Sequence, residues 1–409
     1  MTKVSNIYHF NFINSVLPML KVLLRKNEDK RIRNGHLWVF SNEIDKVIDN
    51  PNNGDLVVVS GSNEQFLGSG FYNQNSLIAV RMISRSPVKN LTDIFSKQIE
   101  NAFKLRKTFY PNRNSFRMVF GESDFLPGLI IDKYNNSFVL QVNSYGMDNN
   151  IHLIVEILKE HYSAENIFTK NDFYLRKLEG LSEQDTVYFG AAGTEIIDDG
   201  LIKYKIDFNN SQKTGFYFDQ SDNRFFIEKI VKDKTVADIF SNSGGFGLHA
   251  LKAGAKLVDF VDSSSREMEN VKYNLSLNNF DTDSKCYTND AFDYLEEAIA
   301  AKKKYDIVML DPPSFAKNRK SLPIAEKGYE RLNKLALQVV KENGYLVTSS
   351  CSYHLLKENF INCLKRAAVK SAKNLQLIQF NGASCDHPQL SSMPETSYLK
   401  FAVFKVFYQ

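Results

Sequence analysis

Hydrophobic and polar residues alternate over short distances in the first part of the chain. Turn-forming runs such as Asn52-Asn53-Gly54-Asp55 separate the alternating segments. A period of two residues between turn formers is typical of strands that bury one face. The segments are rich in β-branched and aromatic residues: LKVLL (20–24), DLVVVSG (55–61), FLGSGFY (66–72) and LIAVRMI (77–83). We therefore predict a small β-barrel domain over residues 19–92.

The next region mixes helical and strand patterns. Helical periodicity runs from about residue 95 to 110 and again over 149–162, and strand-like runs lie near 116–120, 128–134 and 137–142. This mixture predicts a small α+β middle domain over residues 93–190. The segment 194–208 then reads as a hairpin with Asp199-Gly200 at its turn.

From about residue 216 the pattern changes to apolar runs that alternate with helical stretches. The runs are VADIF (236–240), LVDFVD (257–262), YDIVMLD (305–311) and GYLVTSS (344–350). The helical stretches are 244–255, 266–279, 292–304 and 329–344. Strands that are apolar on both faces and alternate with helices indicate a parallel sheet covered on both sides. The sequence thus predicts a doubly wound, Rossmann-like α/β domain over residues 191–409.

Composition narrows the class of protein. The chain has 409 residues, of which 43% are hydrophobic and 24% are charged, as in globular proteins. No stretch approaches the ~20 apolar residues of a membrane span, and residues 1–18 lack the features of a secretory signal. The four cysteines form no CxxC pair, which argues against a disulfide framework or a zinc site. We expect a cytoplasmic protein that does not contact membranes.

The formal net charge of +4 is concentrated near the start of the predicted barrel. Residues 19–35 hold six basic and two acidic residues, so the rest of the chain is balanced. The basic residues are Lys21, Arg25, Lys26, Lys30, Arg31 and Arg33. A basic stretch on a neutral body is typical of a nucleic-acid contact surface. Charge alone favours the simpler alternative, a solvated polar face.

Ligands of doubly wound sheets bind beyond the carboxyl ends of the strands. The first strand is followed by Gly244-Gly245-Phe246-Gly247, which either lets the backbone approach a ligand or forms a tight turn only. Asp262 ends the second strand, where ribose binding is favoured over helix capping. Asp290 follows the third strand, and adenine binding and helix capping explain it equally well.

The last two strand ends carry candidate chemistry. Asp311 is followed by Pro312 and Pro313, which restrict the backbone and hold the carboxylate in one position. This pattern favours a group aimed at an amide-like edge, as in a nucleobase, over a stiff turn. Cys351 follows the fifth strand on the same edge, so its position makes it a candidate nucleophile. The other cysteines, Cys286, Cys363 and Cys385, are expected to be packing residues.

Five motifs in this order resemble class I S-adenosylmethionine (SAM)-dependent methyltransferases: DIFSNSGGFG, VDSS, NDAFDYL, DPPSFAKN and SSCSYHL. More narrowly, the chain from Met19 onwards resembles bacterial 23S ribosomal RNA cytosine-C5 methyltransferases that carry an N-terminal PUA domain. Relatives read DQRxNR where this chain has Ser221 in DQSDNR. Residues 1–18 have no counterpart in the family, which suggests Met19 as the true start.

The resemblance implies that Cys351 adds to carbon 6 of cytosine and that Asp311 binds the amino and N3 edge. It implies SAM as cofactor, 23S ribosomal RNA as partner, no metal, and a homodimer as one expected assembly. The residues expected to bind SAM are Gln220, Asp238, Phe240, Gly244, Gly245, Phe246, Gly247, Asp262, Ser263, Asp290, Asp311 and Pro312. The six basic residues of the barrel are expected to bind RNA.

Three alternatives stay open. A guanine methyltransferase of the same fold needs no cysteine nucleophile, because guanine nitrogens can attack the methyl donor directly. An RNA-binding scaffold with an inactive methyltransferase domain needs no SAM. If the protein were a small-molecule methyltransferase, its basic N-terminal domain would have no role in substrate binding.

Overall fold

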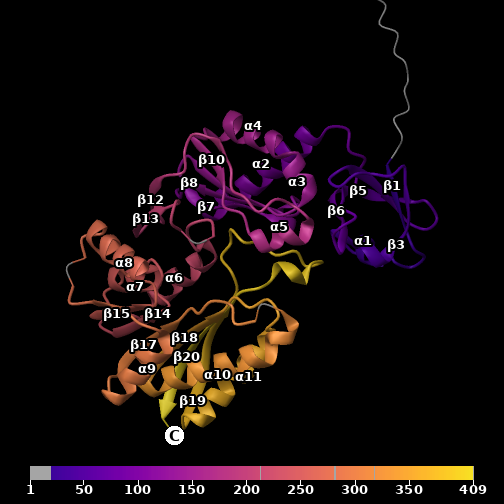
Figure 1. Ribbon diagram of the computed structural model, residues 1–409. Coiled ribbons are helices and arrows are strands. Elements are labelled where there is room, and N and C mark those ends of the chain that lie inside the picture. The colour runs from indigo at the N-terminus through magenta and orange to yellow at the C-terminus, as the bar shows by residue number, and fades with distance from the viewer. Residues whose placement is uncertain (1–19, 212, 281, 317, 409) are drawn as a thin grey trace, which may run out of the picture. The chain divides into compact units, whose positions relative to one another are not determined.

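The computed structural model describes residues 20–211, 213–280, 282–316 and 318–408 (Figure 1). By contacts between residues, the chain divides into two compact units that meet between Lys89 and Asn90. The three-domain division with a boundary at residue 190 stays a prediction. The hypothesis of a start at Met19, and the unlike residues 1–18, lie outside the described residues. No described helix is long and apolar enough to cross a membrane.

The first unit is a curled six-stranded sheet with the strand order β2-β6-β5-β4-β1-β3. Its elements are β1 (Lys21–Leu24), α1 (Lys30–Arg33), β2 (Trp38–Phe40), β3 (Ile44–Ile48), β4 (Leu56–Ser60), β5 (Phe66–Tyr72) and β6 (Ile78–Ser84). Strands β2 and β3 lie at opposite ends of this order, yet only the short helix Ser41–Glu43 joins them. A flat sheet would separate its outer strands by about 24 Å, more than this link can span. The sheet must therefore curl, which confirms the predicted barrel.

The second unit begins with a five-stranded sheet of order β11-β10-β9-β8-β7. Its strands are β7 (Ser115–Phe120), β8 (Leu129–Tyr134), β9 (Ser137–Val142), β10 (Asn166–Thr169) and β11 (Val187–Phe189). Its helices are α2 (Leu91–Phe109), α3 (Tyr145–Asn149), α4 (Ile151–Tyr162) and α5 (Phe173–Glu179). The predicted hairpin follows as β12 (Thr194–Asp198) and β13 (Lys203–Asp207), with Asp199-Gly200 in its turn.

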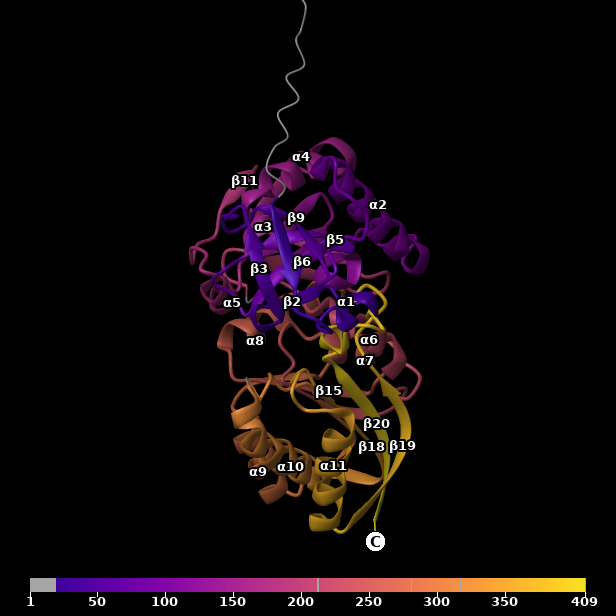
Figure 2. The same ribbon diagram turned by 90° about the vertical axis from the view of Figure 1, so that its right-hand side faces the viewer.

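A seven-stranded sheet of order β16-β15-β14-β17-β18-β20-β19 forms the rest of the unit (Figures 1 and 2). Its strands are β14 (Thr235–Ile239), β15 (Leu257–Asp262), β16 (Lys285–Thr288), β17 (Tyr305–Leu310), β18 (Val340–Ser350), β19 (Lys373–Asn381) and β20 (Lys400–Tyr408). Helices α6 (Ser221–Ile227), α7 (Gly245–Lys252) and α8 (Ser265–Leu277) cover one face. Helices α9 (Ala291–Ala300), α10 (Leu322–Val339) and α11 (Lys357–Lys370) cover the other.

The predicted doubly wound domain is thus present, with two differences. Strands β16, β15, β14, β17 and β18 run parallel, but β20 runs antiparallel to both β18 and β19, so the sheet is mixed. The helix predicted to reach Gly344 ends at Val339, since Val340 is extended and pairs with Tyr305 of β17. Strand pairing there overrides the helical pattern of the sequence.

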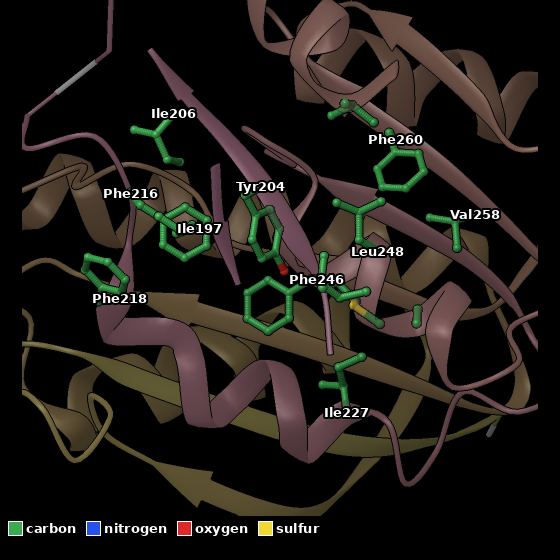
Figure 3. Close-up of a cluster of buried hydrophobic side chains, with 14 of the residues drawn as sticks. Ile197, Tyr204, Ile206, Phe216, Phe218, Ile227, Phe246, Leu248, Val258 and Phe260 are labelled. Atoms are coloured by element: carbon green, nitrogen blue, oxygen red, sulfur yellow. The ribbon is translucent and has the colours of Figure 1, made fainter. Parts of the chain in front are cut away.

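An aromatic core joins the hairpin to the α7 side of the large sheet (Figure 3). Tyr204 of β13 is fully buried, and its ring centroid lies 4.8 Å from that of Phe216. Phe246 of α7 and Phe260 of β15 belong to the same cluster. Burial of several aromatic rings in one cluster stabilises this arrangement, each ring contributing on the order of 2 kcal/mol. The hairpin is therefore fixed beside the glycine-rich loop that begins α7.

Candidate functional site

The candidate site lies where the chain order of the large sheet reverses. Strand β14 lies between β15 and β17, and the later strands continue outward from β17. At such a switch point the loops after neighbouring strands diverge and leave room for a ligand. The glycine-rich loop, Asp262, Asp311 and Cys351 follow β14, β15, β17 and β18, so the fold brings the predicted residues to one edge.

The glycine-rich loop needs glycine at two of its positions. Gly244 adopts a left-handed backbone angle, with φ of 86°, which favours glycine. Phe240, which precedes the loop, has φ of 64°, an angle that bulky residues rarely adopt. A Cβ atom on Gly247 would lie 2.2 Å from a ring carbon of Phe260, so only glycine lets α7 pack this closely on β15. Asp238 is buried and accepts a hydrogen bond from the Gly247 amide at 2.8 Å. Burial raises the pKa of Asp238 to about 7.

The carboxylate of Asp262 binds backbone amides in two loops, the one after β14 and the one after β15. Its two carboxylate oxygens accept hydrogen bonds from the amides of Asn242 and Ser264, each at 3.0 Å. The N-cap of α8 is Ser264, whose hydroxyl accepts from the Glu267 amide. The capping alternative for Asp262 is therefore wrong, and its carboxylate instead fixes the glycine-rich loop. Ser263 is exposed beside it.

Asp290 caps helix α9. Its Oδ1 accepts hydrogen bonds from the amides of Phe292 and Asp293, at 2.8 and 3.4 Å. The capping interpretation is thereby confirmed, and the side chain is exposed. Since both bonds use Oδ1, Oδ2 retains its capacity to accept from a ligand.

Asp311 lies at the centre of a short polar chain. Its Oδ1 accepts from Gln220 Nε2 at 2.9 Å and from the Ser349 hydroxyl. Gln220 in turn accepts from Asn223 Nδ2 at 2.7 Å, which fixes the direction of its amide. Burial raises the pKa of Asp311 to about 6, against the opposing effect of the Ser349 bond. The carboxyl group can therefore exchange a proton near neutral pH.

Cys351 lies directly beside the Asp311-Pro312 segment. Its Sγ is 3.9 Å from the carbonyl oxygen of Pro312, which is itself buried. Burial and the charge of Asp311 raise the pKa of the Cys351 thiol to about 11. The two sequence motifs that contain Asp311 and Cys351 thus meet at adjacent strand ends.

Hydrogen-bonded hydroxyl groups connect the loop after β17 with the loop after β18, which carries Cys351. The Ser352 hydroxyl lies 2.9 Å from the Tyr329 hydroxyl of α10 and 3.0 Å from that of Ser314. Ser350 donates to Tyr329 at 2.9 Å. Buried networks with satisfied partners hold side chains in one arrangement. Tyr329 is consequently a support of the site that no sequence motif indicated.

Arg224 of α6 carries buried donors that lack a partner. Its Nη2 donates to the Tyr217 carbonyl at 2.9 Å, but Nε and Nη1 have no hydrogen bond among the described residues. Its guanidinium lies 4.5 Å from the Phe216 ring centroid, and a Cβ on Gly245 would come within 2.5 Å of Nε. A buried guanidinium without an acceptor is costly unless an anion binds it.

Asp219 and Arg113 are further polar residues that sequence reasoning missed. One oxygen of Asp219 accepts from the Tyr398 hydroxyl at 2.6 Å, and the other is buried with no partner in the described ranges. Arg113 donates to Ser221 Oγ at 2.7 Å, at the position where the resemblance expects arginine. Asp219 lies inside the motif DQSDNR, which was the available signal, whereas Arg113 comes from the distant segment before β7.

The basic residues predicted to bind RNA lie in the first unit, along β1, the next turn and α1. Three form ion pairs within the unit, namely Lys21 with Glu64, Arg31 with Glu43 and Arg33 with Asp29. Arg25 donates to the Ile44 carbonyl at 3.1 Å. The exposed side chains of Lys26 and Lys30 have no hydrogen bond or ion pair to another described residue. Among the six basic residues, the ammonium groups of these two are therefore the most available to bind a phosphate.

The remaining cysteines differ in environment. Cys363 is buried and Cys286 half-buried, in line with the packing role predicted for them. Cys385 is exposed, so the same prediction was wrong for it. In the part of the chain that the structure describes, no group of three His, Cys, Asp or Glu residues is placed to hold a metal ion.

Comparisons with known proteins define the class. A PUA-like domain family matches residues 22–85, and a family described as conserved hypothetical protein 95 matches residues 216–378. A candidate methyltransferase solved with S-adenosylhomocysteine shares the fold, with a TM-score of 0.81 at 22% identity over 95% of this chain and all of that chain. The fold is that of a class I SAM-dependent methyltransferase with a PUA-like domain.

Relatives define the family. Ribosomal RNA large subunit methyltransferase I of Aliivibrio fischeri strain MJ11 is 36% identical over 387 residues, covering 93% of this chain and 98% of the relative. The protein of the same name from Vibrio vulnificus strain YJ016 is 36% identical over 392 residues, covering 94% and 99%. The chain belongs to the ribosomal RNA large subunit methyltransferase I family.

Proposed function

We propose that this protein methylates carbon 5 of a cytosine in 23S ribosomal RNA, through a covalent adduct with Cys351. The observation that carries the proposal is the adjacency of Cys351 and the Asp311-Pro312 segment, with Sγ 3.9 Å from the Pro312 carbonyl oxygen. A nucleophile and a proton-exchanging carboxyl group at one pocket edge suit a base whose target carbon must first be activated. The names of the relatives support ribosomal RNA as the substrate.

The residues present fit the polar groups of SAM. The unpartnered Nε and Nη1 of Arg224 suit the carboxylate of its methionine part. Asp262 suits the ribose hydroxyls and Oδ2 of Asp290 the adenine amino group. A cavity of about 220 Å³, lined in part by Tyr217, Asn242 and Ser243, lies at the start of the glycine-rich loop. When bound, SAM supplies an electrophilic methyl group.

Gly244 and Gly245 would let the loop backbone approach the cofactor, beside Phe240. Gly247 and Phe246, which were also predicted to bind SAM, instead pack against Phe260 and in the aromatic core. Asp238 holds the loop through the Gly247 amide. Gln220 and Pro312, which were predicted to bind SAM, instead contact Asp311 and Cys351. We therefore assign these two residues to the base side of the pocket.

The chemistry assigned to the chain's own residues follows from the reactivity of cytosine. Carbon 5 is a weak nucleophile, so Cys351 adds as thiolate to carbon 6 and makes carbon 5 enamine-like. Asp311 donates a proton to N3 during this addition, which its pKa of about 6 permits. After methylation, N3 returns its proton to Asp311. The carbon 5 proton then leaves to solvent, and its bonding electrons re-form the C5=C6 double bond as the C6–S bond breaks and releases the thiolate of Cys351.

RNA positioning is assigned to the PUA-like unit. Lys26 and Lys30 would contact phosphates, which fix the register of the protein on RNA without reading sequence. The target base must leave its stack to reach the pocket. The homodimer and the cytoplasmic location stay predictions.

The test is to identify the product nucleoside. Labelled SAM and 23S ribosomal RNA from cells that lack this enzyme are incubated with wild type, Cys351→Ala and the exposed-cysteine control Cys385→Ala. We expect 5-methylcytidine from wild type and from the control, and none from Cys351→Ala. A methylguanosine product, or full activity of Cys351→Ala, would favour the guanine methyltransferase instead.

A further inference from the structure

A buried lysine lies next to the turn that carries Cys351. Lys400 begins β20 and pairs in register with Ser350 of β18. Only 7% of its surface is exposed. Its Nζ donates to the carbonyl oxygens of Ser352 and Tyr398, each at 2.6 Å. The ammonium group is therefore bound to the residue that directly follows Cys351.

This lysine has no acidic partner. No carboxylate forms an ion pair with Lys400 within residues 20–211, 213–280, 282–316 and 318–408. Burial of an ammonium group without a counter-charge is costly. Burial lowers the pKa of Lys400 to about 8, and the charge of Cys351 raises it. The thiolate of Cys351 is thus a negative charge that could compensate the ammonium.

Cys351 is otherwise surrounded by groups that oppose its ionisation. Burial and the charges of Asp311 and Asp219 raise its pKa, whereas the exposed Lys213 lowers it. Tyr217, Tyr329 and Tyr398 also interact electrostatically with Cys351, and their own pKa values are raised. A thiolate in these surroundings needs a fixed cation, and the buried ammonium group of Lys400 is bound to the next residue, Ser352.

We propose that Lys400 is a positioning residue that holds the 351–353 turn and stabilises the thiolate of Cys351. The inference rests on the proposed function, in which Cys351 acts as nucleophile. The proton balance depends on the state of Lys400, whose pKa is about 8. Below that pH the thiol releases its proton to solvent while Lys400 keeps its own, and formation of the thiolate gives the buried ammonium group a counter-charge.

The test separates charge from hydrogen bonding. Lys400→Gln keeps a donor for the Ser352 carbonyl but loses the charge, and Lys400→Arg keeps the charge. The rate of alkylation of Cys351 by iodoacetamide is followed by mass spectrometry of its peptide, from about pH 6 to about pH 11. The exposed Cys385 in the same protein is the internal reference, and circular dichroism checks folding.

Below its pKa of about 11, the alkylation rate of Cys351 follows the fraction of thiolate. At about pH 7, where Lys400 is charged, we therefore expect the rate to fall about tenfold or more in Lys400→Gln, the effect of a one-unit rise in pKa. Lys400→Arg should remain near wild type, and Cys385 should not change in either variant. An unchanged Cys351 rate in Lys400→Gln, or equal losses in both variants, would overturn the proposed charge effect. This readout needs no RNA or SAM, so the product test with Cys351→Ala can fail or succeed independently of it.

Discussion

Cys351 Sγ lies 3.9 Å from the carbonyl oxygen of Pro312, although the two residues belong to different strand ends. Adjacent parallel strands β17 and β18 produce this contact, since Leu310 pairs with Thr348 just before the two loops. The loops are further joined by the hydroxyl of Ser352, which lies 3.0 Å from that of Ser314. The proposed nucleophile and the Asp311 segment are therefore held in a fixed mutual geometry by the sheet itself.

Replacement of Asp311 by asparagine removes a proton donor while preserving shape. Asparagine can still accept from Gln220 and Ser349, so the local structure should persist. We expect the methylation rate to fall on the order of 10²–10⁴-fold, the usual contribution of a positioned acid or base. Calorimetry should show SAM binding close to that of wild type. Loss of SAM binding together with activity would instead indicate a disrupted cofactor site.

The same substitution should stabilise the protein at neutral pH. The folded-state pKa of Asp311, about 6, exceeds the unfolded value of about 3.9. The stability that this group contributes is therefore full below about pH 4 and is lost as the pH rises through about 6. At pH 7.5 we expect Asp311→Asn to be more stable by on the order of 3 kcal/mol, since each pKa unit corresponds to about 1.4 kcal/mol. Thermal melts at pH 7.5 and pH 4.5 test this, because the difference should shrink at the lower pH.

Gly247 tests the packing of the cofactor loop. An added Cβ would lie 2.2 Å from Phe260, so α7 or the ring must shift, which typically costs ~1–3 kcal/mol. We expect Gly247→Ala to weaken SAM binding by about tenfold or more in calorimetry. Gly193→Ala is the matched control, since a Cβ there meets no atom within 4 Å. Equal affinities for the two variants would show that the loop tolerates the shift.

A buried ion pair fixes the segment after β19 to the sheet of β7. Both Nη atoms of Arg106 bind Asp124, at 2.6 and 2.7 Å, and Nη2 also donates to the Asp386 carbonyl. Arg106→Met leaves the Asp124 carboxylate buried and unpaired, which should cost ~3–5 kcal/mol of stability in urea unfolding. Arg331→Ala, which breaks an exposed pair with Glu296, should cost less than about 1 kcal/mol. Similar costs for both would contradict the burial argument.

The acidic neighbours of His249 in α7 lead us to expect that the stability of the protein depends on pH. Its ring nitrogens lie 2.6 Å from Glu228 Oε1 and 2.8 Å from Asp199 Oδ2. Burial alone would lower its pKa, but the bonds with Asp199 and Glu228 outweigh burial and raise it, against a smaller opposing effect of Arg224. The contribution of His249 is therefore full below about pH 6.5 and is lost as the pH rises through the raised pKa.

Wild type should accordingly lose melting temperature between about pH 6.5 and pH 9. His249→Gln should be less stable at pH 6.5 and should show a flatter profile over this range. Burial alone would raise the pKa of Asp199, but the hydrogen bond and charge of His249, together with the amides of Ile202 and Leu201, outweigh burial and lower it. Its contribution is present above about pH 4 and is lost as the pH falls further. Parallel profiles for wild type and His249→Gln would refute the prediction.

Much of the fold followed from local pattern. The strand ends could be predicted because buried parallel strands are continuous apolar runs, and their order along the chain places Asp262, Asp311 and Cys351 on one edge. The hairpin at Asp199-Gly200 followed from its turn residues. Each of these patterns lies within a few neighbouring residues, so the strands and the hairpin could be predicted without knowledge of contacts between distant residues.

The supports of the site come from distant segments and carry no local signal. Lys400 occupies a position in β20 where sequence alternation shows only a strand, and its contact with Ser352 depends on antiparallel pairing with β18. Arg113 meets Ser221 only because the two sheets of the second unit pack together. Gln220 was assigned to the cofactor, but its amide lies on Asp311. Long-range pairing decides such contacts, and a single sequence does not specify it.

The central claim is the covalent adduct between Cys351 and a cytosine, and trapping tests it most directly. A 23S ribosomal RNA fragment that contains 5-fluorocytidine is incubated with wild type and SAM, then separated on a denaturing gel. Fluorine at carbon 5 cannot leave as a cation, so the adduct should persist after methylation. We predict a SAM-dependent protein–RNA complex linked through the Cys351 peptide and absent in Cys351→Ala. No complex from an enzyme that methylates the unsubstituted fragment, or a link through another cysteine, would contradict the mechanism.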